Sequence, residues 1–134
     1  MRTGLFPMCA DLLHAGHCLA LAEAKSHCDK LIVALNCLPD NKQPIQSVYE
    51  RWVQLSASKY VDEVVVYAGE KDLELLVAHV NHNIRFVGAD YRGMEYTGKE
   101  IEDRDNVRTV YISRRHNLSS TELKERITKS KRNK

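Results

Sequence analysis

Leu31-Ile32-Val33-Ala34-Leu35 is an apolar run without a polar interruption, and it is the strongest indication of how this chain folds. A strand that has one face in water alternates apolar and polar residues, whereas a strand covered on both faces is apolar throughout. The run therefore predicts a central strand of a parallel sheet. Helices must then cover both faces of that sheet, because parallel strands are joined by crossover connections.

The segments around this run alternate between strand and helix patterns. Residues 3 to 9 form a short apolar stretch, which predicts a strand, and residues 13 to 28 carry apolar residues at helical spacing. After the central strand, the expected elements are a turn-rich segment over 39–44, a helix over 45–59, a strand over 61–67, a helix over 72–81, a strand over 84–87, a loop over 89–106, a strand over 107–112 and a helix over 121–129 capped by Ser119 or Ser120. This order predicts an α/β protein with a three-layer Rossmann-like fold and a five-stranded parallel sheet.

The composition is that of an ordinary globular domain. The chain has 134 residues, of which 43% are hydrophobic and 28% are charged, so one domain over residues 1–134 can build its own core. No apolar run approaches the roughly 20 residues of a membrane helix, and the first residues lack a secretory pattern. We therefore expect a cytoplasmic protein with no membrane partner. The four cysteines form no Cys-x-x-Cys pair and are expected to stay reduced.

Positive charge is concentrated near the C-terminus, where residues from about 129 to 134 form a basic tail. The cations of the last two turns and the tail are Lys124, Arg126, Lys129, Lys131, Arg132 and Lys134, against the single acid Glu125. Nucleic-acid binding usually adds aromatic residues to such charges, and none is interleaved here. A solvated helix end is therefore the expected structure, and nucleic acid is not an expected partner.

The sequence Asp11-Leu12-Leu13-His14-Ala15-Gly16-His17 follows the first expected strand and opens the first expected helix. Ligands of open parallel sheets bind beyond the carboxyl ends of the strands, and the unpaired N–H groups of a helix N-terminus attract phosphate. His14 and His17 share one helical face, and Gly16 leaves room for a phosphate. A metal site or a merely polar helix start are the alternatives. Further ligands at an established metal spacing are missing, which favours phosphate.

Three motifs in order make the chain resemble the cytidylyltransferase-like nucleotidyltransferases, and most of all the bacterial glycerol-3-phosphate cytidylyltransferases. The first is the H-x-G-H signature within residues 11–17. The second is Lys59-Tyr60-Val61-Asp62-Glu63-Val64, which resembles the mid-chain strand of the family, and the third is Leu118-Ser119-Ser120-Thr121, which resembles its closing I-S-T-T motif. The resemblance implies transfer of a nucleoside monophosphate from a nucleoside triphosphate, CTP in particular, to a phosphorylated small molecule such as glycerol 3-phosphate, with release of pyrophosphate.

The resemblance also implies roles for individual residues. His14 and His17 would hold the triphosphate and stabilise the transition state at the α-phosphorus, and Lys42 could add catalytic charge. Arg51 and Lys59 would bind the acceptor. The nucleotide would contact Cys9, Ala10, Asp11, Gly16, Gly88, Asp90, Tyr91, Arg114, Leu118, Ser119, Ser120 and Thr121.

The chemistry of such a transfer agrees with these residue types. Attack by the acceptor phosphate on the α-phosphorus expels pyrophosphate, so negative charge must be stabilised on both sides of that phosphorus. No covalent nucleophile is needed. Mg²⁺ is the expected cofactor, held through the oxygens of the triphosphate and water. Related enzymes are commonly dimers, so the resemblance also implies a homodimer.

The chain departs from the family pattern next to the histidines. Met8, Cys9 and Ala10 stand where the family usually has Gly-Thr-Phe, and Lys59 stands where the cytidylyltransferases tend to have arginine. Two alternative functions stay open. One is an ATP-dependent adenylyltransferase that acts on a sugar phosphate or a flavin, and the other is a protein that binds a nucleotide without turnover.

Overall fold

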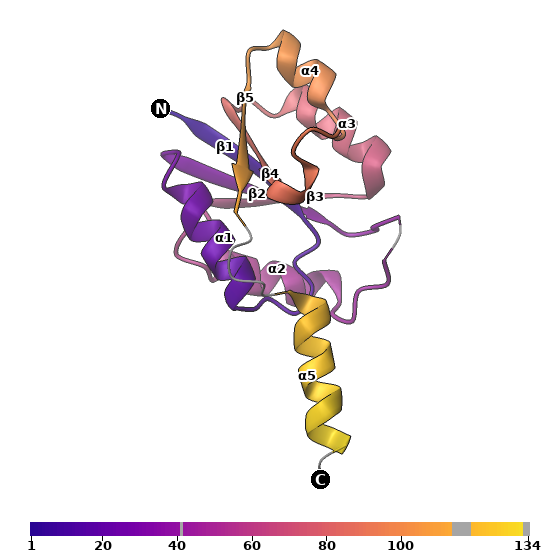
Figure 1. Ribbon diagram of the computed structural model, residues 1–134. Coiled ribbons are helices and arrows are strands. Elements are labelled where there is room, and N and C mark those ends of the chain that lie inside the picture. The colour runs from indigo at the N-terminus through magenta and orange to yellow at the C-terminus, as the bar shows by residue number, and fades with distance from the viewer. Residues whose placement is uncertain (41, 114–118, 133–134) are drawn as a thin grey trace.

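A five-stranded sheet with the strand order β3-β2-β1-β4-β5 forms the centre of the structure, a computed structural model that describes residues 1–40, 42–113 and 119–132 (Figure 1). All four pairings between neighbouring strands are parallel. The strands are β1 (Thr3–Met8), β2 (Lys30–Asn36), β3 (Glu63–Tyr67), β4 (Ile84–Gly88) and β5 (Arg108–Ile112). The predicted fold class is confirmed.

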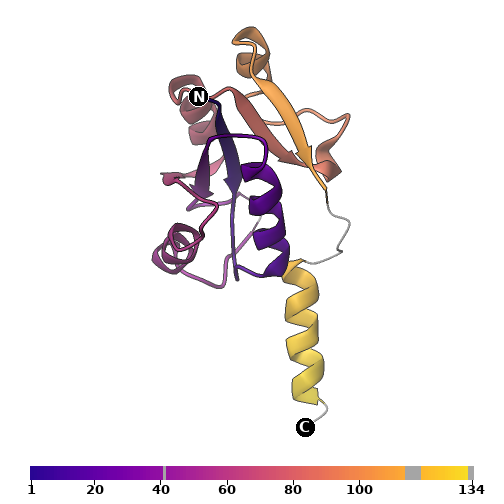
Figure 2. The ribbon, with the colours of Figure 1, turned by 90° about the vertical axis from the view of Figure 1, so that its left-hand side faces the viewer.

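Helices cover both faces of this sheet and enclose two cores. The helices are α1 (Ala15–Lys25), α2 (Val48–Ser56), α3 (Gly69–His79), α4 (Lys99–Arg104) and α5 (Ser120–Arg132), with a 3₁₀ turn η1 (Ala89–Tyr91) after β4. Helices α1 and α2 pack on one face of the sheet, and α3 and α4 lie on the other (Figures 1 and 2). The three-layer arrangement predicted from the sequence is therefore present.

The central strand β2 contributes to both cores. Leu31, Val33 and Leu35 belong to the core under α1 and α2, whereas Ile32 and Ala34 belong to the core under α3. None of these side chains is more than 5% exposed. The apolar run is thus uninterrupted for the predicted reason, because β2 is covered on both faces.

Helix starts differ from the sequence predictions where local capping decides them. Helix α2 begins at Val48, because the Oγ of Ser47 accepts a hydrogen bond from the Glu50 N–H and the Glu50 carboxylate accepts one from the Ser47 N–H. This capping box stabilises a helix start at that point.

Helix α5 extends beyond the predicted end at residue 129 to Arg132, so the described part of the basic tail is helical.

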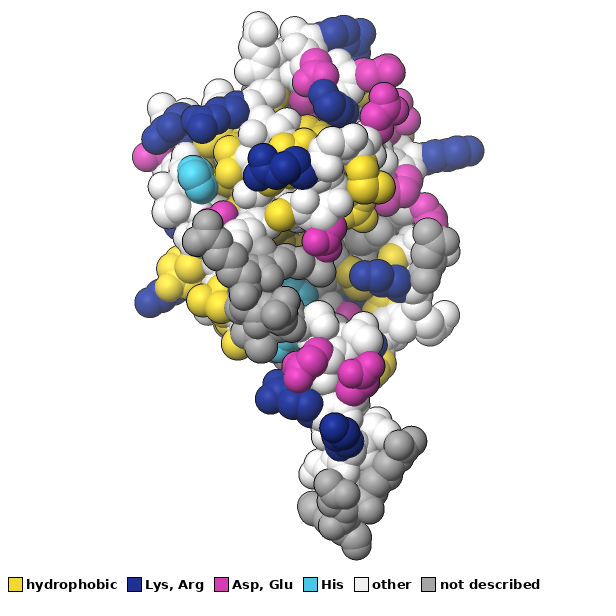
Figure 3. Space-filling model, viewed as in Figure 1, with side chains coloured by type: hydrophobic (Ala, Val, Ile, Leu, Met, Phe, Trp, Pro, Cys, Tyr) yellow, Lys and Arg dark blue, Asp and Glu magenta, His cyan; other side chains and the backbone are white. Residues whose placement is uncertain are grey.

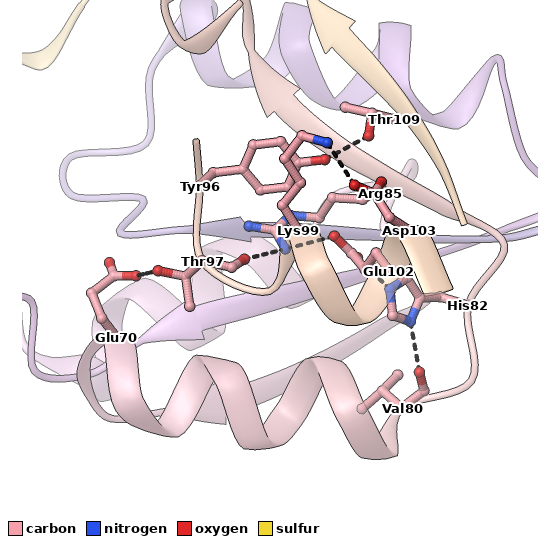
Figure 4. Close-up of polar contacts among 10 residues, drawn as sticks. All are labelled: Glu70, Val80, His82, Arg85, Tyr96, Thr97, Lys99, Glu102, Asp103 and Thr109. Atoms are coloured by element: carbon pink, nitrogen blue, oxygen red, sulfur yellow. Dashed lines mark hydrogen bonds and ion pairs between the residues drawn. The ribbon is translucent and has the colours of Figure 1, made fainter. Parts of the chain in front are cut away.

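The segment predicted as a loop over residues 89–106 contains the turn η1 and the short helix α4. A buried polar cluster attaches α4 to the sheet (Figure 4). Glu102 of α4 is 1% exposed, its Oε1 lies 3.2 Å from Nη1 of Arg85, and its Oε2 lies 2.5 Å from Nε2 of His82. Arg85 also donates to the Thr97 carbonyl and lies 4.8 Å from the centre of the Tyr96 ring. A buried glutamate conceals the helical pattern of α4, which explains why the prediction missed it.

Helix α5 projects away from the sheet and ends at the far tip of the molecule (Figures 1 and 2). Ser119 caps its start, because the Oγ of Ser119 accepts a hydrogen bond from the Glu122 N–H at 3.1 Å. Ser119 is one of the two capping residues predicted from the sequence. A salt bridge of 3.7 Å between Nζ of Lys124 and Oδ2 of Asp11 joins α5 to the segment that follows β1. Throughout the described ranges, no helix is long and apolar enough to cross a membrane.

Candidate active site

Residues 9–14, which we call the histidine loop, join the carboxyl end of β1 to the start of α1. Strand β1 lies at the centre of the sheet, between β2 and β4, so the loop lies where the strand order reverses. Ala10 and Leu12 adopt left-handed backbone conformations, with φ of 55° and 52°. Such conformations cost free energy in residues other than glycine and persist only where the surroundings hold them. The histidine loop is therefore held in a defined, strained conformation.

The two histidines cap the N-terminus of α1. Nδ1 of His14 accepts a hydrogen bond from the Gly16 N–H at 2.9 Å, and Nδ1 of His17 accepts one from the His14 N–H at 3.2 Å. A nitrogen that accepts from a backbone N–H carries no proton of its own, so each neutral ring has its proton on Nε2. The ring centres lie 4.1 Å apart. An Nε2–H is a donor of the kind that phosphate oxygens accept.

Asp11 binds the histidine loop to the segment that leads into α2. Its two carboxylate oxygens accept hydrogen bonds from the Ile45 and Gln46 N–H groups, both at 3.0 Å. The side-chain oxygen of Gln46 in turn accepts from the Leu12 N–H at 2.7 Å. Burial alone would raise the pKa of Asp11, but these two backbone hydrogen bonds, with Lys124 and Arg51 nearby, lower the pKa below its usual value.

Replacing Asp11 by asparagine is expected to reduce the free energy of unfolding at neutral pH by about 1–3 kcal/mol, because one of the two charge-assisted hydrogen bonds is lost. A carboxylate with a lowered pKa stabilises the fold above its unfolded-state pKa, and this contribution disappears as the pH falls through the folded-state value. Urea unfolding below about pH 5 should therefore show a steeper acid loss of stability in the wild type than in Asp11→Asn, which keeps only the contributions of other carboxylates such as Asp62. Glu74→Gln, on the exposed side of α3, is the control and should keep the wild-type profile. Equal acid slopes for wild type and Asp11→Asn would contradict the prediction.

Arg51 of α2 lies below the histidine loop. It is 2% exposed, and its Nη1 donates to the Cys9 carbonyl at 2.9 Å and to the Asn36 carbonyl at 2.8 Å. The structure therefore places Arg51 in the interior, where its Nη1 donates to two backbone carbonyls, and not on an acceptor surface as the predicted acceptor role required.

Lys59, the other residue assigned to the acceptor, lies between the end of α2 and the start of β3. This connection is at the amino ends of the strands, since Asp62 within it accepts a hydrogen bond from the N–H of Leu31 at the start of β2. The ammonium of Lys59 lies 5.2 Å from the centre of the Tyr60 ring. The structure therefore brings Lys59 to the edge of the sheet opposite the histidines. Lys42 is exposed and follows β2, so it lies at the same edge of the sheet as the histidines.

A second loop lies at the same carboxyl edge of the sheet as the histidine loop. Gly88 ends β4, the neighbour of β1, and Asp90 and Tyr91 follow it in η1. The space around Gly88 is open, because a Cβ added there would meet no atom within 4 Å. Tyr91 is 49% exposed. Gly88 and Tyr91, which the sequence assigned to the nucleotide, are therefore accessible at the carboxyl edge of the sheet.

The start of α5 supplies the third part of the site. Ser119 and Thr121 lie at this start, and the salt bridge between Lys124 and Asp11 links α5 to the histidine loop. Figure 3 shows charges of both signs on the part of α5 nearest the body of the molecule and histidine side chains close to the start of that helix. Arg114, Leu118 and the side chain of Ser120, which the sequence also assigned to the nucleotide, lie outside the described part of the structure.

Sequence reasoning missed Gln46 and Lys124 as residues of this site. Gln46 contacts Leu12 from a position 34 residues further along the chain, and the turn-rich segment before it carries no pattern that reports this contact. Lys124 was assigned to a solvated helix end. Its spacing from Thr121, one helical turn, is the only signal that could have linked it to the closing motif.

Comparison with known proteins gives the class and the family of the chain. Residues 5–126 match the family model of cytidylyltransferase-like proteins. The chain is 38% identical over 99 residues to the bifunctional protein HldE of Campylobacter curvus, which covers 69% of this chain and 21% of that protein. It is 31% identical over 127 residues to HldE of Gluconacetobacter diazotrophicus, which covers 90% of this chain and 26% of that protein. The chain thus spans about a quarter of the length of these curated relatives.

A solved structure supports the same assignment. The lipopolysaccharide core biosynthesis protein from Thermoplasma volcanium superposes with a TM-score of 0.69 at 26% identity, covering 84% of this chain and 97% of that one. The fold and the family match together place the chain in the nucleotidyltransferase class of α/β proteins. The chain belongs to the cytidylyltransferase-like family.

Proposed function

We propose that this chain transfers a nucleoside monophosphate from a nucleoside triphosphate to a phosphorylated small molecule. The observation that carries the proposal is the histidine pair, in which the backbone occupies each Nδ1 and leaves the proton on Nε2. An oxygen of the acceptor phosphate attacks the α-phosphorus, the bond from that phosphorus to the bridging oxygen of the β-phosphate breaks, and pyrophosphate leaves. His14 and His17 donate hydrogen bonds to the oxygens on which charge develops.

Mg²⁺ belongs to this proposal as a companion of the triphosphate. Both oxygens of Asp11 are engaged by backbone N–H groups, and no group of three metal-ligating side chains is found among the described residues. A Mg²⁺ ion held by triphosphate oxygens and water would need no ligand set of its own from the protein. Bound there, Mg²⁺ would supply charge neutralisation at the phosphates.

The acceptor has two candidates of related chemistry. The motif resemblance favours CTP and a polyol phosphate such as glycerol 3-phosphate. The 26% identical structure from Thermoplasma volcanium is that of a lipopolysaccharide core biosynthesis protein. This relative favours a sugar phosphate as the acceptor, with ATP as the alternative to CTP.

The test is an assay of pyrophosphate release with CTP or ATP against glycerol 3-phosphate, sugar phosphates and a flavin phosphate. We expect one pairing to give pyrophosphate and the nucleotidyl product in equal amounts, with loss of both in a variant at His14. His79→Asn, an exposed histidine at the end of α3, is the matched control and should keep the activity. Tight nucleotide binding without product in any pairing would contradict the proposal and favour a binding protein. Homodimer formation stays a prediction, which sedimentation equilibrium tests.

A further inference from the structure

We infer that Arg51 is a positioning residue, which holds the histidine loop in its working conformation through the carbonyl of Cys9. The inference rests on the proposed function for its catalytic consequence. Its structural content, that Arg51 fixes the loop that presents His14 and His17, can be measured separately.

The contacts of Arg51 join three elements at one nitrogen. Nη1 carries two hydrogens, and its bonds at 2.9 Å to the Cys9 carbonyl and 2.8 Å to the Asn36 carbonyl use both. Cys9 directly follows β1, and Asn36 ends β2. From α2, Arg51 therefore ties together the carboxyl ends of the two strands that border the histidine loop.

The burial of this charge is not explained by an ion pair. Among the residues that the structure describes, no carboxylate forms a salt bridge with Arg51, and its Nε is buried without a hydrogen-bond partner. A buried guanidinium bonded only to neutral groups is less stable than an apolar side chain of similar size. Such a local conflict is typical of positions retained for a site and not for stability.

The backbone next to Cys9 explains what Arg51 holds. Ala10 and Leu12 are left-handed, and this conformation needs support on both sides. The lead-in to α2 supplies that support after Ala10, through the hydrogen bonds to Asp11 and Leu12. Arg51 supplies it before Ala10. Without Arg51, residues 9–12 are free to relax toward the right-handed region, which displaces His14 at the end of the loop.

The experiment compares Arg51→Met with Leu55→Ala. Methionine keeps most of the apolar stem of Arg51 and removes the donors and the charge. Leu55 lies one turn further along α2, is 0% exposed and takes no part in the hydrogen bonds to the Cys9 and Asn36 carbonyls, so its loss weakens the packing of α2 and leaves those hydrogen bonds in place. We expect Arg51→Met to lower kcat by about 100-fold, the typical effect of a misplaced catalytic group. Leu55→Ala should lose stability and keep kcat.

Amide hydrogen exchange provides a readout that needs no substrate. The N–H groups of His14 and Gly16 donate to the histidine rings, and no helical hydrogen bond protects the first amides of a helix. We expect these two amides to exchange faster in Arg51→Met than in Leu55→Ala, when each rate is compared with that of the α3 amides, which report the change in global stability. Wild-type kcat and wild-type exchange in folded Arg51→Met would overturn the inference. If no pairing of triphosphate and acceptor gives product with the wild type, the proposed function fails, and the exchange experiment alone decides the role of Arg51.

Discussion

His14→Asn is expected to lower kcat for nucleotidyl transfer by about 100- to 1,000-fold, the cost of removing one preorganised donor from a developing oxyanion. The asparagine side-chain oxygen can replace Nδ1 as acceptor of the Gly16 N–H, and asparagine is among the best N-cap residues. The midpoint of thermal unfolding should therefore stay close to that of the wild type. The substitution separates the two roles of His14, because only Nε2 is lost.

His14→Ala completes the comparison. It removes the cap together with Nε2, so it should lose as much activity as His14→Asn and also about 1 kcal/mol of stability. Steady-state kinetics with the productive pairing of substrates and thermal unfolding measure both effects. A wild-type kcat in His14→Asn would show that Nε2 takes no part in the transfer, and a large loss of stability in the same variant would show that the capping geometry is wrong.

Glu102→Ala is expected to reduce the free energy of unfolding by about 3–5 kcal/mol, the usual cost of removing one partner from a buried ion pair. The carboxylate of Glu102 contacts both Arg85 and His82, whose side chains are 5% and 3% exposed. Its loss leaves a buried guanidinium without a carboxylate and a buried imidazole with one partner fewer. The cavity left by the side chain adds to this cost.

The control for this prediction is the next residue of α4. Asp103 forms a salt bridge with Lys99 at 2.7 Å, but both side chains are exposed, so Asp103→Ala should not measurably change stability. Urea unfolding of the two variants compares the loss of a buried carboxylate and an exposed one from the same helix. A similar, small change in both would mean that the cluster of Figure 4 contributes little to the fold.

The fold could be predicted from the sequence because its signal lies in local apolar patterns. The run over residues 31–35 requires burial on both faces, and the structure divides its side chains between two cores. Helix α4 could not be predicted in the same way. Its buried face includes Glu102, a residue type that is rarely buried unless paired, and its partners Arg85 and His82 precede it by 17 and 20 residues.

The site was predictable in its position and less so in its contacts. The histidine spacing and the place of the pair after the first strand follow from the sequence, since strand ends of a parallel sheet meet at one edge. The roles of Arg51 and Asp11 depend on contacts across 42 and 35 residues of chain. A family pattern records that an arginine stands at such a position. It does not record whether its guanidinium faces a ligand or the backbone.

The capping of α1 by its own histidines makes helix initiation and tautomer selection one event. Enzymes that use a neutral histidine as a donor commonly recruit another side chain to choose the tautomer, whereas here the amide groups of the peptide backbone make that choice. Once a helix starts at His14, the segment from His14 to His17 therefore fixes by itself which ring nitrogen of each histidine carries the proton. Such autonomy is consistent with a chain that keeps both histidines while the residues before them, Met8 to Ala10, have changed from the family pattern.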